Sequence, residues 1–318
     1  MSDNINKKVL LVGAGQMAVD HYKVLKALNC DVTVVGRSKS SALSFEEKTD
    51  FKIHEGGLEL FLQQNKLHFD VAFVSVGMEV LAITTTQLLN SGFKTILVEK
   101  PAGMNRAEIE ALATLSTQLE AAVFVAYNRR FYASVLKAKE VIALDGGLSS
   151  FNFEFTEWAH TIEPLDKKPG IKENWLLANS SHVIDLAFFV GGIPTKMNSF
   201  TSGNLSWHEK AVFSGAGKTT EDILFSYQAN WAGPGRWGVE FITKKSRLYL
   251  RPLEELHIQL KGTVAVNKME LDQSSEKNFK PGLFLQNQYF LKGDFTNFKT
   301  IQEQAQMTAV YEQIAKGN

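Results

Sequence analysis

The strongest constraint on the fold is the stretch of residues 9–18, which reads Val-Leu-Leu-Val-Gly-Ala-Gly-Gln-Met-Ala. Its apolar first half predicts a buried strand, and its Gly-x-Gly-x-x-Ala pattern predicts a tight turn into a helix. Gly13 permits the turn, Gly15 leaves room for a phosphate against the backbone, and Ala18 allows the helix to pack closely on the strand. The N–H groups at such a helix start, with the helix dipole, favour a bound anion.

The residues that follow support this interpretation over an ordinary glycine-rich turn. Apolar positions recur at helical spacing as far as residue 28, and residues 31–35 predict a second buried strand. Strand, glycine turn, helix and strand within about 30 residues form the dinucleotide-binding unit. We therefore expect a Rossmann domain that binds NADP or NAD. The residues expected to hold the cofactor at this turn are Gly13, Gly15, Gln16 and Met17.

The residues after the second strand bear on the choice of cofactor. Residues 36–40 read Gly-Arg-Ser-Lys-Ser, where the adenosine ribose should lie, and they include no acidic residue that would favour NAD. Arg37, Ser38 and Lys39 instead offer donors and positive charge suited to a 2′-phosphate. We expect NADP in preference to NAD; a solvated basic turn is the alternative.

Composition limits the classes of protein that the chain can belong to. A chain of 318 residues predicts two domains, and 44% hydrophobic residues suffice for packed cores. The 34 basic and 34 acidic residues cancel, so charge gives no reason to expect a nucleic-acid or membrane partner. The single cysteine, Cys30, suggests a reducing compartment and is expected to be a buried filler. Residues 1–8 lack the apolar core of a signal peptide, and no apolar run is long enough to span a bilayer, which predicts a cytoplasmic protein.

Alternating strands and helices continue through the first part of the chain. Buried strands are expected at residues 69–76, 95–98 and 121–127, the last counted as the sixth, with a helix from 80 to 89. Asn105 and Glu108 form a plausible capping box for a helix that ends near residue 120. This order predicts an α/β fold in which residues 1–126 form a doubly wound parallel-sheet Rossmann domain.

The pattern changes beyond residue 127. A helix is expected from 131 to 144, and residues 151–158 alternate strictly, as in a half-buried antiparallel strand. We expect an α+β domain over residues 127–299 with a large open, mainly antiparallel sheet, followed by a C-terminal helix within 300–318. The further strands expected are 196–202, 210–214, 222–231, 238–243, 247–250 and 264–271, interrupted by a helix at 181–190.

The strand ending at residue 98 runs into Glu99, Lys100 and Pro101. Ligands of open α/β sheets sit beyond the carboxyl ends of the strands, so Lys100 should point toward the nicotinamide, where a lysine can relay a substrate proton. Pro101 holds the residue before it in an extended conformation. A surface Glu-Lys pair is the alternative.

Four motifs in this order resemble one known family. They are Val-Gly-Ala-Gly-Gln-Met-Ala near the start, Glu99-Lys100-Pro101, Tyr127-Asn-Arg-Arg-Phe131, and Ser181-His182-Val-Ile-Asp185-Leu186. The chain resembles the glucose–fructose oxidoreductase and inositol dehydrogenase family (Gfo/Idh/MocA) over nearly its whole length. The resemblance implies a second domain whose open sheet commonly mediates homodimers or homotetramers. It also implies NAD(P)-linked oxidation or reduction of the CH–OH groups of sugars, cyclitols or their derivatives, including nucleotide-linked ones.

The resemblance also implies roles for single residues. Lys100 matches the catalytic lysine and Pro101 its fixed partner, and the three residues from Glu99 also contact the cofactor. His182 matches the active-site histidine, a general acid/base. Asp185 matches the acidic residue one turn later, on the same helix face, where it could orient the imidazole. A histidine that caps or packs this helix is the alternative.

One position departs from the family pattern. Many members have an aspartate four residues before the histidine, and this chain has Ala178 there, with Asn179 beside it to offer neutral hydrogen bonds. The change leaves open a different substrate geometry, a preference for carbonyl reduction, or no catalysis. A dinucleotide-sensing regulatory protein of the same fold is therefore the alternative function, and an imine or a tetrapyrrole is an alternative substrate.

Other candidates for substrate contact lie near the domain junction. Asn128 and Arg129 follow a strand at its carboxyl end, where the arginine could clamp a carboxylate or phosphate, or form an ion pair at the junction. The aromatic candidates are Trp158, His160 and Trp175, of which at least one is expected in the core. The substrate-binding candidates are Asn128, Arg129, Asn179 and Asp185, no metal ligands are expected, and the turn at residues 231–237 is interpreted as a structural hairpin.

Overall fold

The computed structural model describes residues 5–65 and 67–318, so residues 1–4 of the polar N-terminal segment lie outside it. The chain divides into two compact units, which are described here one at a time. The first comprises the residues up to 128 together with 275–306, and the second comprises residues 129–274 and 307–318. The sequence analysis assigned 275–299 to the second domain. They belong to the first because a helix and a short strand of this segment join its layers.

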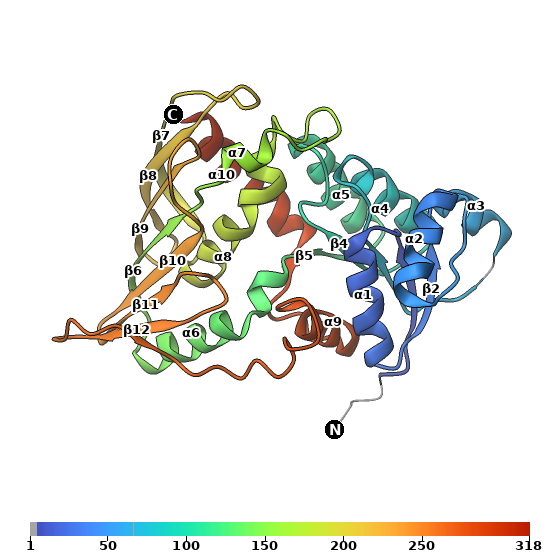
Figure 1. Ribbon diagram of the computed structural model, residues 1–318, viewed down its shortest axis with the longest axis horizontal. Coiled ribbons are helices and arrows are strands. Elements are labelled where there is room, and N and C mark those ends of the chain that lie inside the picture. The colour runs from blue at the N-terminus through green and yellow to red at the C-terminus, as the bar shows by residue number, and fades with distance from the viewer. Residues whose placement is uncertain (1–4, 66) are drawn as a thin grey trace. The chain divides into compact units, whose positions relative to one another are not determined.

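The first unit contains a six-stranded sheet in the order β14-β5-β4-β3-β1-β2 (Figure 1). Five strands are mutually parallel, which confirms the doubly wound sheet: β1 (Lys8–Val12), β2 (Asp31–Val35), β3 (Val71–Val74), β4 (Thr95–Glu99) and β5 (Ala122–Ala126). The strand counted as the sixth from sequence is the fifth. The sixth is β14 (Lys299–Thr300), which pairs antiparallel with β5 and is too short to show a hydrophobic period.

Helices cover this sheet (Figure 1). They are α1 (Gln16–Ala27), α2 (Lys39–Thr49), α3 (Gly57–Gln64), α4 (Leu81–Asn90), α5 (Arg106–Gln118) and α9 (Leu283–Lys292). The capping box is confirmed, because Asn105 Oδ1 accepts a hydrogen bond from the Glu108 backbone N–H at 3.0 Å. Helix α9 packs on α1 and was not anticipated. Cys30 is a buried free thiol whose pKa is raised by burial, as expected of a filler.

The second unit contains an eight-stranded sheet in the order β13-β12-β11-β10-β6-β9-β8-β7. Its strands are β6 (Leu148–Glu154), β7 (Pro194–Ser202), β8 (Val212–Thr219), β9 (Leu224–Asn230), β10 (Gly238–Thr243), β11 (Ser246–Leu250), β12 (His257–Leu260) and β13 (Asn267–Lys268). The sheet is mainly antiparallel, as predicted, with one parallel pair, β6 with β9.

Three local predictions in this sheet are wrong. The strand expected at 151–158 ends at Glu154, and the strand expected at 264–271 shrinks to Asn267–Lys268, while β12 was missed. Residues 231–237 are not a hairpin. They connect β9 to β10, and these two strands lie on opposite sides of β6. A local turn pattern does not reveal that a third strand lies between the two that it joins.

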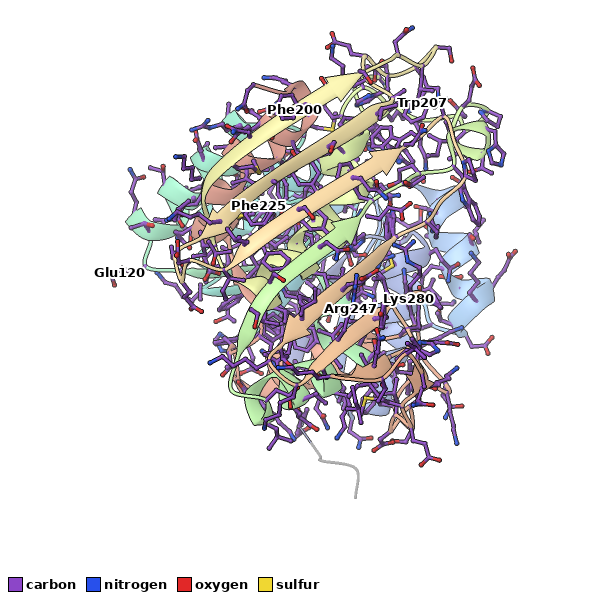
Figure 2. The ribbon with its side chains drawn as sticks, turned by 90° about the vertical axis from the view of Figure 1, so that its left-hand side faces the viewer. Glu120, Phe200, Trp207, Phe225, Arg247 and Lys280 are labelled. Carbon is purple, nitrogen blue, oxygen red and sulfur yellow. The ribbon has the colours of Figure 1, made fainter. Side chains whose placement is uncertain are left out.

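One face of the eight-stranded sheet forms the core of the second unit. Phe151, Phe153 and Phe155 alternate inward along and just beyond β6, and helix α8 (Ser181–Gly191) packs over them. The other helices contributing to this unit are α6 (Ala133–Leu144), α7 (Ala159–Ile162) and the end of α10 (Ile301–Lys316). Figure 2 looks onto the opposite face, which carries Phe200, 68% exposed, and Arg247.

The described residues include no helix that combines the length and the apolar character needed to cross a bilayer. They also contain no group of three or more histidine, cysteine, aspartate or glutamate residues arranged to hold a metal ion.

Candidate active site

The two glycines of the first turn are needed for different reasons. Gly13 has φ +128°, and a Cβ there would lie 2.0 Å from the backbone oxygen of Ser75, so the packing of the chain itself requires glycine. Gly15 caps α1 with φ −81°, and an added Cβ would meet nothing within 4 Å. The fold does not explain why this position is glycine. A phosphate group lying against the backbone does, so the turn fits a dinucleotide.

The N-terminus of α1 favours a bound anion. No described side chain caps it, and its first turn contains no acidic residue that would repel an anion. Gln16 accepts a hydrogen bond from Lys48 Nζ at 3.1 Å, and Lys280 Nζ lies 2.8 Å from the sulfur of Met17. Lys280, labelled in Figure 2, is 263 residues away in sequence, so it could not be assigned to this turn from spacing.

The basic turn after β2 is exposed. Ser38 caps α2, since its hydroxyl accepts a hydrogen bond from the Ser41 N–H at 3.3 Å. Among the described residues, the side chains of Arg37 and Lys39 make no ion pair or hydrogen bond. Two positively charged side chains without a counter-ion in the described part of the chain therefore lie just after β2. Ser38 has a structural role as the N-cap of α2, which was not predicted from the sequence.

The end of β4 is held by a buried hydrogen-bond chain. His21 Nε2 lies 3.1 Å from Glu99 Oε1, and His21 Nδ1 lies 3.1 Å from Asn287 Oδ1. His21 is 2% exposed, so α1 and α9 together fix the carboxylate beside Lys100. The sequence analysis missed His21 and Asn287. A polar residue on the apolar face of the first helix was the available signal.

Further contacts fix the residues that follow β4 and β5. Gln304 donates to the Pro101 oxygen at 3.1 Å and accepts from the Tyr127 hydroxyl at 3.3 Å. Asn128 is 5% exposed, and its amide donates to the Pro281 oxygen at 2.9 Å. Asn128 therefore anchors the returning loop, and its role in binding substrate stays a prediction.

In the second unit, an unexpected carboxylate lies beside the segment that contains His182. A π-helical turn, Leu176–Ser180, precedes α8, and His182 in the first turn of α8 is 8% exposed. Glu157 is 1% exposed and accepts hydrogen bonds from Asn179 Nδ2 at 3.0 and 3.2 Å and from Ser180 Oγ at 2.7 Å. Burial raises the pKa of Glu157, and the hydrogen bond from Ser180 and the charge of Arg236 partly offset that rise.

Glu157 could have been found from the sequence. It continues the inward alternation of Phe151, Phe153 and Phe155, so a carboxylate occupies a position where the strand pattern expects an apolar side chain. Ala178 takes the place of the family aspartate, and Glu157 brings a different carboxylate to the neighbouring Asn179. The Asn179 amide donates its hydrogen bonds to Glu157, and its contact with substrate stays a prediction.

Asp185 has a partner that the sequence analysis did not consider. Arg130 donates to both of its oxygens, from Nε at 2.7 Å and from Nη2 at 2.8 Å, and the side chains are 9% and 1% exposed. This bidentate pair joins the segment after β5 to α8. The carboxylate is thus engaged inside the unit, and a direct contact of Asp185 with substrate stays a prediction. That it orients His182 stays a prediction.

Two arginines and an indole ring lie near Glu157. The Arg129 and Arg236 guanidinium carbons are 4.7 and 4.9 Å from the centre of the Trp237 ring, and the His182 ring centre is 6.2 Å from it. Arg236 also lies 4.8 Å from the half-exposed ring of Trp158. The segment interpreted as purely structural therefore contributes Arg236 and Trp237 to this cluster. Trp175 is buried in the core, as expected for one of the aromatic candidates.

The comparisons with known proteins agree with this fold. A family model for shikimate / quinate 5-dehydrogenase matches residues 1–98. No curated protein sequence matches the chain. A levoglucosan dehydrogenase in complex with NADH and levoglucosan aligns with a TM-score of 0.78 at 16% identity, covering 97% of this chain and 96% of that one.

Two further solved structures are similar over almost their whole length. A UDP-N-acetylglucosamine 3-dehydrogenase from Acidithiobacillus ferrooxidans has a TM-score of 0.75 at 11% identity, with 98% and 97% covered. An oxidoreductase from Agrobacterium radiobacter, in complex with NAD+, L-tartaric acid and magnesium, has a TM-score of 0.76 at 12% identity, with 96% and 94% covered. The chain therefore has the two-sheet fold of NAD(P)-dependent oxidoreductases.

Proposed function

We propose that the protein is an NADP-preferring oxidoreductase of the Gfo/Idh/MocA type that acts on a secondary alcohol or ketone of a sugar, a cyclitol or a derivative. The observation that carries this proposal is Gly15, whose missing side chain the fold does not require and a dinucleotide does. The neighbours of the same fold that act on levoglucosan and on UDP-N-acetylglucosamine support the substrate class.

The residues proposed to hold the cofactor come from the ends of three strands. Gly13, Gly15, Gln16 and Met17 follow β1; Arg37, Ser38 and Lys39 follow β2; Glu99, Lys100 and Pro101 end and follow β4. The cations of the β2 turn support NADP, because nothing in the described chain neutralises them. The bound cofactor supplies or accepts the hydride.

Lys100 and His182 are proposed to donate a proton to the substrate oxygen or to accept one from it. A lysine beside a fixed carboxylate and an imidazole are side chains suited to general acid and base catalysis. Glu99, held by His21, keeps the segment around Lys100 in place. Glu157 is almost fully buried, so it acts as a positioning residue through Asn179 and Ser180, which lie in the turn just before the helix of His182.

The test is a panel of sugars, cyclitols and their keto forms assayed with NADP(H) by nicotinamide absorbance. We expect turnover with at least one member, faster with NADP(H) than with NAD(H). Tight NADPH binding without turnover on any member would contradict the proposal and favour the second candidate, a dinucleotide-sensing regulatory protein. Ala178 in place of the family aspartate is the observation that supports that candidate.

We also propose that the protein forms a homo-oligomer through the outer face of the eight-stranded sheet (Figure 2). Phe200 and Leu224 point outward from β7 and β9 and are 68% and 62% exposed. Sedimentation equilibrium should show more than one chain per particle, and Phe200→Glu should lower that number. A monomeric parent protein would refute the proposal.

A further inference from the structure

Two neighbouring arginines in the second unit differ in how their charge is balanced. Arg130 is paired with Asp185 through two hydrogen bonds of 2.7 and 2.8 Å. Across residues 5–65 and 67–318, the guanidinium of Arg129 makes no hydrogen bond or ion pair to another side chain or backbone group. A guanidinium has five donors in a fixed fork, so this residue retains its full capacity to bind a carboxylate or phosphate.

The surroundings of Arg129 are unfavourable for an uncompensated charge. Its pKa is lowered by burial and by the charge of Arg236, while Tyr132, Glu254 and Glu157 act in the opposite direction without hydrogen-bonding it. An arginine stays charged under such conditions, because its ordinary pKa is above 12. Holding a partly buried charge without a hydrogen-bonded counter-ion costs stability, which an incoming anion would restore.

A second guanidinium shares the same ring. Arg236 and Arg129 lie 4.9 and 4.7 Å from the centre of the Trp237 indole. The carboxylate of this cluster, Glu157, already accepts hydrogen bonds from Asn179 and Ser180, and its distance to Arg236 Nη1 is 3.8 Å. Two cations therefore lie against one aromatic ring, and Glu157 forms its ion pair with Arg236 rather than with Arg129.

We propose that Arg129 and Arg236, with the Trp237 ring, bind an anionic group of the substrate, so that the substrate is an acidic sugar or cyclitol derivative. The inference rests on the proposed oxidoreductase function and narrows its substrate class. Carboxylates and phosphates both match the guanidinium fork, and the buried Trp237 ring holds the two guanidinium groups in place through cation–π contacts. The anion is the carboxylate of a sugar acid or the phosphate of a sugar phosphate.

The test compares three probes that share a hexose ring: D-glucose, D-glucuronate and D-glucose 6-phosphate. Their binding to the full-length protein is measured by calorimetry and tryptophan fluorescence at constant ionic strength. We expect one of the two anions to bind at least about tenfold more tightly than glucose, as charge-assisted hydrogen bonds require. Whichever anion is preferred identifies carboxylate or phosphate as the recognised group.

Substitutions of Arg129 and Arg236 test whether these two residues cause the preference for an anionic ligand. Arg129→Gln should weaken anion binding roughly 10- to 100-fold, and Arg236→Gln, which changes a half-exposed side chain, should act in the same direction without threatening the fold. Arg106→Gln removes an equal charge from the surface of α5 and should leave binding unchanged. Equal binding of glucose and both anions, no anion binding at tens of millimolar, or unchanged binding in both arginine variants would overturn the inference.

The same experiment separates this inference from the proposed function. Arginine-dependent anion binding without nicotinamide oxidation or reduction on any acidic substrate would leave the anion site standing and remove the oxidoreductase. Turnover of neutral sugars that is insensitive to both arginine variants would keep the oxidoreductase and remove the anion site.

Discussion

The two units place their candidate functional groups by different physical means. In the first unit the topology of the sheet does it: the glycine turn, the basic turn and Lys100 all follow parallel strands at their carboxyl ends. In the second unit a network of side chains does it, since Glu157, Asn179 and Arg236 come from three separate segments and meet through hydrogen bonds and an ion pair. Backbone topology tolerates many changes of side chain, whereas such a network depends on each member.

Removing the Lys100 side chain should have the largest effect on turnover. It tests whether a strand end of the first unit carries the chemistry. Lys100→Ala is expected to lower kcat by about 10²- to 10⁴-fold, as for loss of a general acid/base, with NADPH affinity changed only severalfold. Steady-state kinetics and a fluorescence titration of NADPH measure the two quantities. Lys94→Ala, just before the opposite end of β4, is the matched control and should be silent. Unchanged turnover in Lys100→Ala would mean that this strand end does not carry the chemistry.

Substitutions of Gly13 and Gly15 should separate the glycine required by the fold from the glycine required by the cofactor. Gly13→Ala places a Cβ against the Ser75 oxygen in a left-handed conformation, and should cost about 3 kcal/mol or more of unfolding free energy. Gly15→Ala meets open space at an ordinary φ, so it should keep its melting temperature and lose roughly tenfold or more in dinucleotide affinity. Thermal unfolding and cofactor titration of both variants test this. Normal NADPH binding by Gly15→Ala would remove the main support for a dinucleotide site.

The first unit was largely predictable from sequence because its signals are local. The motif at residues 9–18 specifies strand, turn and helix within one short stretch, and the carboxyl-end rule then places Lys100 at a ligand-binding edge of the sheet. Asn287 and Lys280 escaped prediction because they reach His21 and Met17 from a segment that returns to this unit late in the chain. A contact across more than 260 residues leaves no trace in a local pattern.

The second unit was predictable as an architecture and hardly at all as a site. Period-2 alternation identifies half-buried strands, but it does not give strand order, so residues 231–237 were mistaken for a hairpin. Roles based on helical spacing also fell short. Asp185 lies one turn from His182, yet both of its oxygens bind Arg130, which precedes it by 55 residues. Side-chain networks are decided by tertiary packing, which spacing alone does not encode.

Reversing the charge after β2 should have an intermediate effect on cofactor choice. Arg37→Asp removes a guanidinium suited to a 2′-phosphate and introduces an acceptor for ribose hydroxyls, so the ratio of NADPH to NADH affinity should fall roughly 10- to 100-fold. Titrations with both cofactors measure the ratio. Arg106→Asp, on the exposed surface of α5, serves as the charge control. Equal binding of NADPH and NADH by the parent protein would refute the assignment of this turn.

The smallest expected effect is a change in the pH dependence of stability in Glu157→Gln. This change tests whether the Glu157 carboxyl group is buried in a hydrogen-bond network. Burial raises its pKa above an ordinary value near 4.5, so the folded state holds this proton more tightly than the unfolded state. The contribution of Glu157 to stability is therefore greatest below about pH 4.5 and falls as pH rises through the folded pKa, by about 1.4 kcal/mol for each unit of pKa difference. The stability of Glu157→Gln relative to the parent protein should consequently improve with rising pH, as measured by urea unfolding between pH 4 and 8.

A second acid in the same unit provides a control of opposite sign. Desolvation raises the pKa of Asp145, but hydrogen bonds from Ser246 and Thr243 outweigh it, so the pKa is lowered overall from a value near 3.8. Asp145 therefore stabilises the folded state above that pH, and its contribution is lost as pH falls below it. Asp145→Asn should become relatively less harmful in acid, as measured by urea unfolding between about pH 2 and 5. Opposite slopes for the two variants would show that burial governs Glu157 and hydrogen bonding governs Asp145. A flat slope for Glu157→Gln would mean that Glu157 is solvated in the folded protein, and a slope of the same sign as that of Asp145→Asn would mean that its hydrogen bonds outweigh its burial.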